Sequence, residues 1–133
     1  MPGRGSPPQI TPDTTKTKGD RGEQLAAQHL VAQGYHIVER NYRCRRGEID
    51  IIAEERGVLC FVEVRSVASR TFGDPLETIK PAKQRRILLA ARHYITAKRI
   101  RDRAIRFDVV GVVHQPALEI QLVRGAFEDH AMW

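Results

Sequence analysis

Two short apolar runs, 47–53 and 59–65, constrain the fold of this chain most, because each contains a carboxylate. The runs are typical of two adjacent β-strands joined by a turn at 54–57, with Asp50 in the first and Glu63 in the second. Burying an ionised carboxylate is costly unless a cation or hydrogen bonds compensate it. Asp50 and Glu63 therefore need a partner, and the candidates are a metal ion, Arg65, or both.

Side-chain alternation places Glu63 and Arg65 on one face of their strand. Successive strand residues rise about 3.3 Å and point to opposite faces, so these two side chains lie roughly 7 Å apart along the strand. Both faces of the run are otherwise apolar, as in a central strand that is covered on both sides. A tight turn between the two strands would place Asp50 beside the Glu63 end of its neighbour.

Length and charge set the class of protein. The chain has 133 residues, which favours a single domain, and its formal net charge of +6 favours a polyanionic partner, with nucleic acid ahead of an acidic membrane surface. No apolar run is long enough to cross a bilayer, and the apolar segment of a signal peptide is missing, so we expect a cytoplasmic protein without membrane contact. The two cysteines lack metal-ligand spacing, which argues against a zinc site. The sequence leaves a homodimer open.

The order of the predicted elements is helix, three strands, helix, two strands, which indicates an α/β sandwich around a mixed sheet. Residues 1–18 are predicted to form a disordered tail and residues 19–133 a single domain. The first helix is expected to begin near Gly19 and Asp20, with Asp20 as its N-cap. The second is expected to carry Pro81 in its first turn. The strands are expected at 35–42, 47–53, 59–65, 105–113 and 118–123, with a turn at 43–47 and a loop at 67–77.

Five motifs in order along the chain resemble a known family. They are Gly22-Glu23, Gly47-Glu48-Ile49-Asp50, Phe61-Val62-Glu63-Val64-Arg65, Lys83-Gln84 and Arg106-Phe107-Asp108-Val109-Val110. An Asp and a Glu-x-Lys/Arg on neighbouring strands resemble the PD-(D/E)XK nuclease superfamily, and the span 19–127 resembles the YraN-type bacterial proteins. The resemblance implies a restriction-endonuclease-like fold, α/β with a central mixed five-stranded sheet flanked by helices. It also makes archaeal Holliday-junction resolvases the nearest well-described enzymes.

The same resemblance implies a metal-dependent site. The metal, Mg²⁺ or Mn²⁺, would be held by Asp50, Glu63, the carbonyl of Val64 and Glu23, because hard cations prefer oxygen ligands. The implied catalytic residues for phosphodiester hydrolysis are Asp50, Glu63, Arg65 and Glu23. Arg65 stands where the superfamily has a lysine. An arginine stabilises an anion but stays protonated, so it cannot serve as a general base.

Basic residues outside the two carboxylate strands predict where DNA would lie. Phosphate contacts are expected from Arg43, Arg45 and Arg46, which precede the Asp50 strand, and from Lys83 and Arg86 on the second helix. Such contacts supply affinity without sequence choice.

Three functions stay open on the sequence alone. The first is a metal-dependent endonuclease for structured or branched DNA. The second is a nucleic-acid-binding protein on the same fold with weak or lost catalysis. The third is a protein–protein adaptor whose carboxylates form a structural salt-bridge cluster. Glu23 can equally be a carboxylate that the helix dipole favours near a helix N-terminus, and Asp108 is expected to cap the sheet or to pair with an arginine in it.

Overall fold

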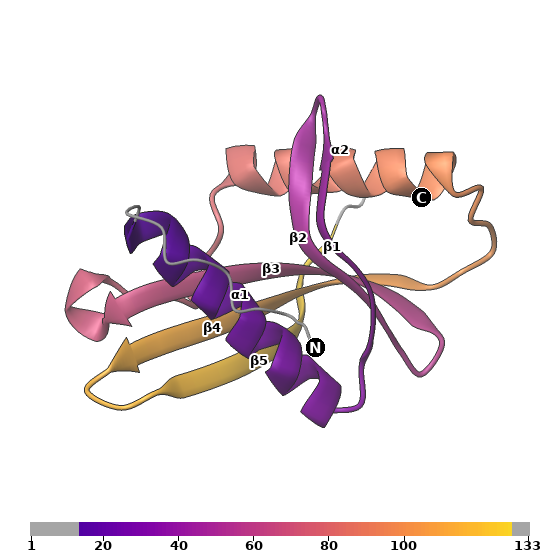
Figure 1. The fold of residues 1–133 in the computed structure, drawn as a ribbon. Helices are drawn as coiled ribbons and strands as arrows, with labels where there is room; N and C mark the ends of the chain where they lie inside the picture. The colour runs from indigo at the N-terminus through magenta and orange to yellow at the C-terminus, as the bar shows by residue number, and fades with distance from the viewer. Residues whose placement is uncertain (1–13, 129–133) are drawn as a thin grey trace, which may run out of the picture.

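A computed structural model describes residues 14–128 of the chain, with side chains from residue 20 onward, and shows one mixed sheet with a helix on each face (Figure 1). The strand order is β1-β2-β3-β4-β5; β3 and β4 are parallel, and the other neighbours are antiparallel. This is the predicted α/β architecture. Its elements are α1 (Thr14–Ala32), β1 (His36–Cys44), β2 (Gly47–Glu55), β3 (Val58–Ser69), the 3-10 helix η1 (Arg70–Phe72), α2 (Pro81–Ala97), β4 (Ile105–Gln115) and β5 (Glu119–Phe127).

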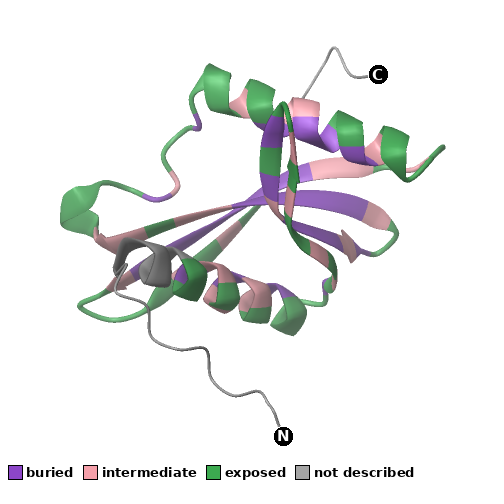
Figure 2. Cartoon of the chain, turned by 45° about the horizontal axis from the view of Figure 1, so that its top comes forward, coloured by how far each residue is buried: buried purple, intermediate pink, exposed green. Residues whose placement is uncertain are grey.

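The core has two halves because both faces of the central strands are apolar. On one face α1 packs Ala26 and Leu30 against side chains of β2, β3 and β4. On the other, α2 packs Ile87, Ala91 and Tyr94 against side chains that include Phe61. Figure 2 shows the middle of the sheet buried and each helix buried along one side only. The helix α2 also provides the crossover that parallel strands such as β3 and β4 require.

Helix α1 begins at Thr14, so the predicted start near Gly19 and Asp20 is wrong. The prediction treated Asp20 as an N-cap, but residues 13–19 contain no proline and the helix extends toward Pro12. Residues 1–13 of the predicted tail lie outside the described part of the chain. Glu23 consequently lies in the middle of α1. The helix dipole acts mainly within the terminal turn, so it does not account for this carboxylate.

Several strands extend beyond the apolar runs that predicted them. Strand β3 continues to Ser69 because it pairs with β4 along that whole length, which shortens the loop predicted at 67–77. Strand β1 continues to Cys44, so Arg43 belongs to a strand and the turn consists of residues 45–46. Backbone pairing extends each strand past the point where the side-chain pattern ends.

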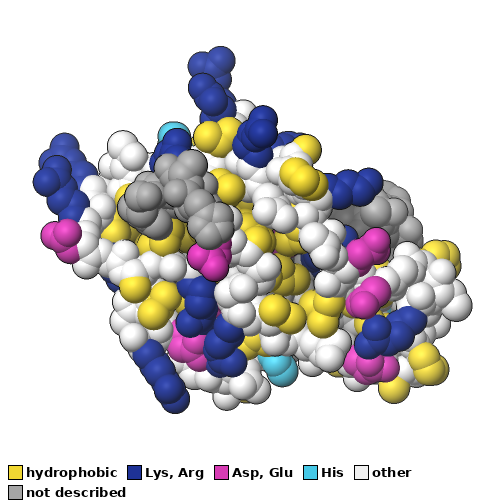
Figure 3. All heavy atoms as spheres, turned by 180° about the vertical axis from the view of Figure 1, so that it is seen from behind, with side chains coloured by type: hydrophobic (Ala, Val, Ile, Leu, Met, Phe, Trp, Pro, Cys, Tyr) yellow, Lys and Arg dark blue, Asp and Glu magenta, His cyan; other side chains and the backbone are white. Residues whose placement is uncertain are grey.

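The surface is mixed in character. Seen from behind, basic side chains project around the rim with acidic ones among them and apolar areas between (Figure 3). No helix within residues 14–128 is long and apolar enough to span a membrane.

Candidate functional site

The two carboxylates meet where β2 and β3 part. The antiparallel register ends with Ile51 opposite Val62, so Asp50 and Glu63 are the next residues on the two strands. Beyond that pair, the Asp50 side chain acts as the acceptor that a strand backbone would otherwise provide, and the Val64 N–H donates a 2.8 Å hydrogen bond to Asp50 Oδ2. The sequence placed Asp50 beside Glu63, and the register does so too.

The negative charge of Glu63 disfavours the ionisation of Asp50. Glu63 is only 8% exposed. Burial first, and then the negative charge of Glu63, raise the pKa of Asp50 to about 7, although the Val64 N–H and the charge of Lys83 oppose the shift. Two carboxylates in one poorly solvated place form an arrangement that a bound cation would relieve.

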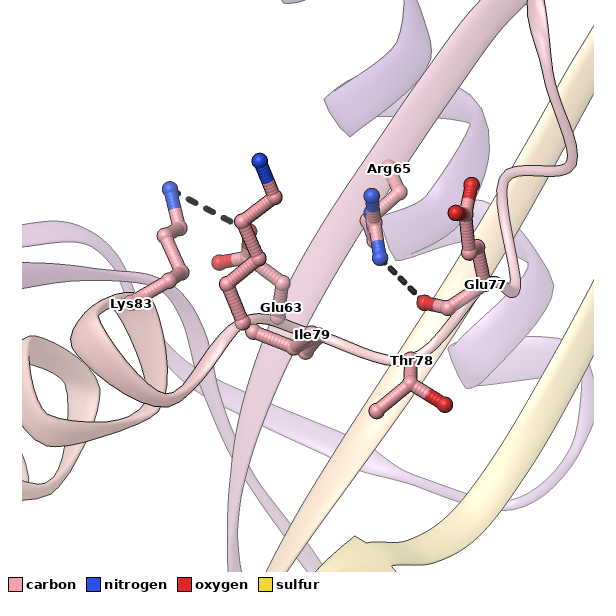
Figure 4. A pocket seen from close by; sticks show the side chains of 7 residues that line it. Glu63, Arg65, Glu77, Thr78, Ile79 and Lys83 are labelled. Carbon is pink, nitrogen blue, oxygen red and sulfur yellow. Dashed lines mark hydrogen bonds and ion pairs between the residues drawn. The ribbon is translucent and has the colours of Figure 1, made fainter.

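The cation nearest to Glu63 comes from α2. Lys83 Nζ lies 3.4 Å from Glu63 Oε2, and Figure 4 shows the two side chains pointing toward each other. Arg65 shares the Glu63 face of β3, as predicted, but its guanidinium donates to the backbone carbonyl of Glu77. Lys83, rather than Arg65, is therefore the counter-charge of the carboxylate pair. The sequence could not show this, because the contact depends on how α2 is seated on the sheet.

A cavity of about 280 Å³ opens beside Glu63. Its lining combines two acids, Glu63 and Glu77, with three cationic side chains. The excess of positive charge suits a phosphate group. The lining residues are Glu63, Arg65, Glu77, Thr78, Ile79, Lys80 and Lys83.

Glu23, on α1, lies close enough to Asp50 for their charges to interact. Its side chain is 17% exposed, and its Oε1 lies 3.5 Å from Arg40 Nη2. Burial and the charge of Asp50 raise the pKa of Glu23, while Arg40 opposes the shift. Glu23 is therefore an electrostatic neighbour of Asp50, and its part in catalysis stays a prediction.

The oxygen atoms at this place fit a hard divalent cation. Asp50 and Glu63 offer carboxylate oxygens, and the Val64 carbonyl points to the same side of β3 as the N–H that Asp50 accepts. Within residues 14–128, no three His, Cys, Asp or Glu side chains form a group that could hold a metal ion. A cation would thus be held by two carboxylates, one carbonyl and water, without the third carboxylate that the sequence predicted from Glu23. Mg²⁺ commonly keeps several waters in this way.

The arginines predicted to bind phosphate are brought beside α2 by Gly47. A Cβ atom on Gly47 would lie 2.3 Å from the carbonyl oxygen of Arg86, so the β1–β2 hairpin touches α2 through this glycine. The exposed turn 45–46 and Arg86 therefore lie near one another, at the edge where the hairpin passes α2 in Figure 1. Arg43 is also exposed, but it faces Glu48 at 3.7 Å, which offsets part of its charge.

A second charged cluster lies on the α1 face of the sheet. Asp108 is fully buried and accepts hydrogen bonds from Tyr35 Oη and Arg106 Nε, both at 2.8 Å. Arg106 Nη2 also lies 2.7 Å from Glu55 Oε1, and Arg124 Nη2 lies 2.6 Å from Glu55 Oε2. The predicted pairing of Asp108 with an arginine is confirmed. Glu55 was assigned to a turn, and the signal missed was its position at the end of the apolar run.

The two helices, the mixed sheet and the carboxylates at the parting of its strands define a restriction-endonuclease-like α/β protein. The chain belongs to the uncharacterised protein family UPF0102, whose model matches residues 22–112. This confirms the YraN-type resemblance.

Relatives in this family match almost the whole chain. A UPF0102 protein of Nitrosococcus oceani is 43% identical over 120 residues, which cover 89% of this chain and 97% of the relative. A UPF0102 protein of Myxococcus xanthus is 41% identical over 121 residues, which cover 90% of this chain and 96% of the relative. A UPF0102 protein of Syntrophus aciditrophicus is 46% identical over 111 residues, which cover 83% of this chain and 87% of the relative. Their names state no activity.

Proposed function

We propose that this protein is a metal-dependent endonuclease that hydrolyses phosphodiester bonds in structured or branched DNA. The observation that carries the proposal is the juxtaposition of Asp50 and Glu63, of which Glu63 lines a cavity that also has three cationic side chains. A salt-bridge cluster would pair each acid with a cation. Here the pKa of Asp50 is raised, because burial and Glu63 outweigh the charge of Lys83.

Each residue of the site has a role in this proposal. Asp50, Glu63 and the Val64 carbonyl would hold Mg²⁺ or Mn²⁺, which when bound lowers the pKa of a water and stabilises the leaving oxygen. Arg65 and Lys83 line the cavity where the phosphate would lie, and their charge would stabilise the negative charge that develops there. Glu23 acts through its charge on Asp50.

The distribution of basic residues supports a DNA substrate chosen by shape. Arg45, Arg46 and Arg86 surround the contact between the hairpin and α2, on the part of the molecule that also carries Lys83. Contacts from such side chains to phosphates set affinity and orientation but read no bases.

Incubation with linear, nicked, flapped and four-way DNA in Mg²⁺ or Mn²⁺ tests the proposal. We expect metal-dependent cleavage of at least one structured substrate, loss of that cleavage in chelator, and its loss in Asp50→Ala. Absence of cleavage on every substrate, or cleavage that persists in Asp50→Ala, would refute the proposal.

One observation favours a second candidate, a DNA-binding protein that has lost catalysis. Arg65 replaces the lysine of the superfamily motif and is engaged with the Glu77 carbonyl rather than with the carboxylate pair. Such a protein would bind the same DNA shapes, and Asp50→Ala would leave binding in chelator unchanged.

Both candidates predict salt-sensitive DNA binding through the hairpin edge. Reversing the charge of Arg45 and Arg46 together should weaken binding about tenfold or more at 100 mM salt and reduce the slope of log affinity against log salt by about two. Reversing Arg99, just after α2, should change the affinity less. Fluorescence anisotropy of labelled DNA across a salt series measures both, and the opposite ranking would place the binding surface elsewhere.

A further inference from the structure

The first turn of α2 carries charge of the wrong sign for a helix N-terminus. The helix begins at Pro81 after Lys80, has no acidic residue in its first turn, and has no side-chain hydrogen bond capping it. The N-terminus of a helix carries a partial positive charge, which favours anions and disfavours cations. Lys80 and Lys83 are therefore placed against the helix dipole. An anion held between them would offset that cost.

The acidic side chain beside Lys83 is Glu63, and the ion pair between them is partly exposed to solvent. Glu63 is more than nine-tenths buried, whereas the Lys83 side chain is 51% exposed and reaches Glu63 from solvent at 3.4 Å. A lysine has a flexible stem and a compact charge, so it can leave one partner for another without moving the backbone.

Hydrogen bonds hold the loop before α2 to its neighbours near Lys83. Gln84 Nε2 donates a 2.7 Å hydrogen bond to the Ile79 carbonyl, which ties the preceding loop to the first turn of α2. Arg65 is tied to the carbonyl of Glu77 in the same loop. Of the residues that contact the carboxylate pair, Lys83 is thus the one that can move.

We propose that Lys83 is a displaceable counter-ion of Glu63. In the metal-free protein Lys83 neutralises Glu63. When the Glu63 carboxylate binds a divalent cation instead, the Lys83 side chain is released into the cavity and contacts a phosphate of the DNA. This inference rests on the metal site of the proposed function.

Displacement couples the two ligands. Lys83 and the divalent cation compete for Glu63, while Lys83 and the phosphate attract each other. Divalent-cation binding therefore strengthens DNA binding, and by linkage DNA strengthens cation binding by the same factor. Lys83 carries this part of the coupling, so one substitution should reduce it.

Isothermal titration calorimetry of Mn²⁺ binding to the full-length protein, without DNA, tests whether Lys83 and the cation compete for Glu63. Lys83→Gln should bind Mn²⁺ about fivefold more tightly than wild type, because a partly exposed ion pair no longer competes. Lys80→Gln is the matched control, since it removes the same charge from the same cavity and leaves the Lys83–Glu63 pair intact. It should change the affinity less than twofold. Lys83→Arg, which restores the charge, should return the affinity toward wild type.

The second measurement is DNA binding with and without Ca²⁺, an oxygen-binding cation of the same charge. Ca²⁺ should strengthen DNA binding by wild type and by Lys80→Gln to the same extent, and by Lys83→Gln to a smaller extent.

The outcomes separate the two proposals. If wild type binds no Mn²⁺, or if Asp50→Asn binds it equally well, the metal site of the proposed function is wrong and the inference falls with it. If wild type binds Mn²⁺ but Lys83→Gln does not bind it more tightly, or if Lys80→Gln gains as much, the inference alone is overturned. Thermal melting identifies variants that do not fold. In that case Lys83→Arg still decides, because a conservative variant with much altered Mn²⁺ affinity contradicts a purely electrostatic role.

Discussion

Two regions of the sheet carry carboxylate clusters with opposite electrostatics. On the α1 face, Asp108 and Glu55 are surrounded by donors, and the bonds from Arg124 and Arg106 lower the pKa of Glu55 to about 2 even though burial opposes the shift. At the parting of β2 and β3, Asp50 has the pKa of about 7 that burial and Glu63 impose. One cluster is thus stabilised as ions, and the other is held in a state that resists ionisation.

This difference in electrostatics separates charged residues that stabilise the fold from charged residues placed to bind a ligand. A buried charge that serves the fold is matched by bonded partners, as Asp108 is by Arg106, Tyr35 and the N–H of Gly125. A pair left with mutual repulsion costs stability, and such costs are typical of sites that bind a ligand. The first cluster should therefore respond to substitution by unfolding, and the second by gaining stability.

Removing the central cation of the α1-face cluster should have the largest effect. Arg106→Ala would leave Asp108 buried with a charge that Tyr35 and Gly125 alone cannot balance, and we expect a loss of about 3–5 kcal/mol in the free energy of unfolding. Urea unfolding followed by circular dichroism measures it.

Arg103→Ala is the control for that substitution. Its ion pair with Glu54, at 2.7 Å, is as short as that of Arg106 with Glu55. Its two side chains are 28% and 37% exposed, so the expected loss in the free energy of unfolding is under about 1 kcal/mol. Equal losses in the two variants would remove the distinction between a buried network and a surface pair.

The second prediction concerns the other cluster and has the opposite sign. Asp50→Asn keeps an oxygen for the Val64 N–H but removes the charge, so at pH 8 without metal it should stabilise the fold by about 2 kcal/mol. The folded-state pKa of Asp50 is raised, so its ionisation destabilises the fold progressively as pH rises from about 4 to about 7. The gain in the variant should grow across that window and be small below it.

Thermal melts of both proteins from pH 4 to pH 8 in chelator measure this gain. Glu55 provides the internal comparison, because its lowered pKa makes its contribution constant above about pH 4.5 and lost only as pH falls toward about 2. A destabilised Asp50→Asn at pH 8 would show that Asp50 belongs with the structural cluster instead.

The sequence predicted the fold from features that are local. The apolar alternation around Asp50 and Glu63, the Gly57 turn and Pro81 at the start of α2 each act within a few residues, and the predicted order of elements is the observed one. The start of α1 was missed because a possible N-cap at Asp20 is a weaker signal than the absence of proline from residues 13–19.

The sequence predicted the candidate site less completely, because the site depends on packing. Asp50 and Glu63 could be placed together since a tight turn fixes their register. The partners that Lys83 and Arg65 have in the structure could not be predicted. Which of two cations reaches Glu63 depends on the seating of α2 and on a carbonyl of Glu77 that satisfies Arg65.

The smallest effect expected comes from one hydroxyl in the α1-face cluster. Tyr35 Oη donates to Asp108 Oδ2 at 2.8 Å, but Arg106 Nη2 also reaches that oxygen, at 3.0 Å. Tyr35→Phe would therefore weaken the network without leaving the carboxylate bare, and a loss of about 1 kcal/mol is expected. Tyr42→Phe is the matched control, since that hydroxyl bonds to His93 in an exposed position, and it should cost less. Urea unfolding at pH 7 measures both. A larger loss for Tyr42→Phe than for Tyr35→Phe would contradict the view that the α1-face network stabilises the fold through its buried bonds.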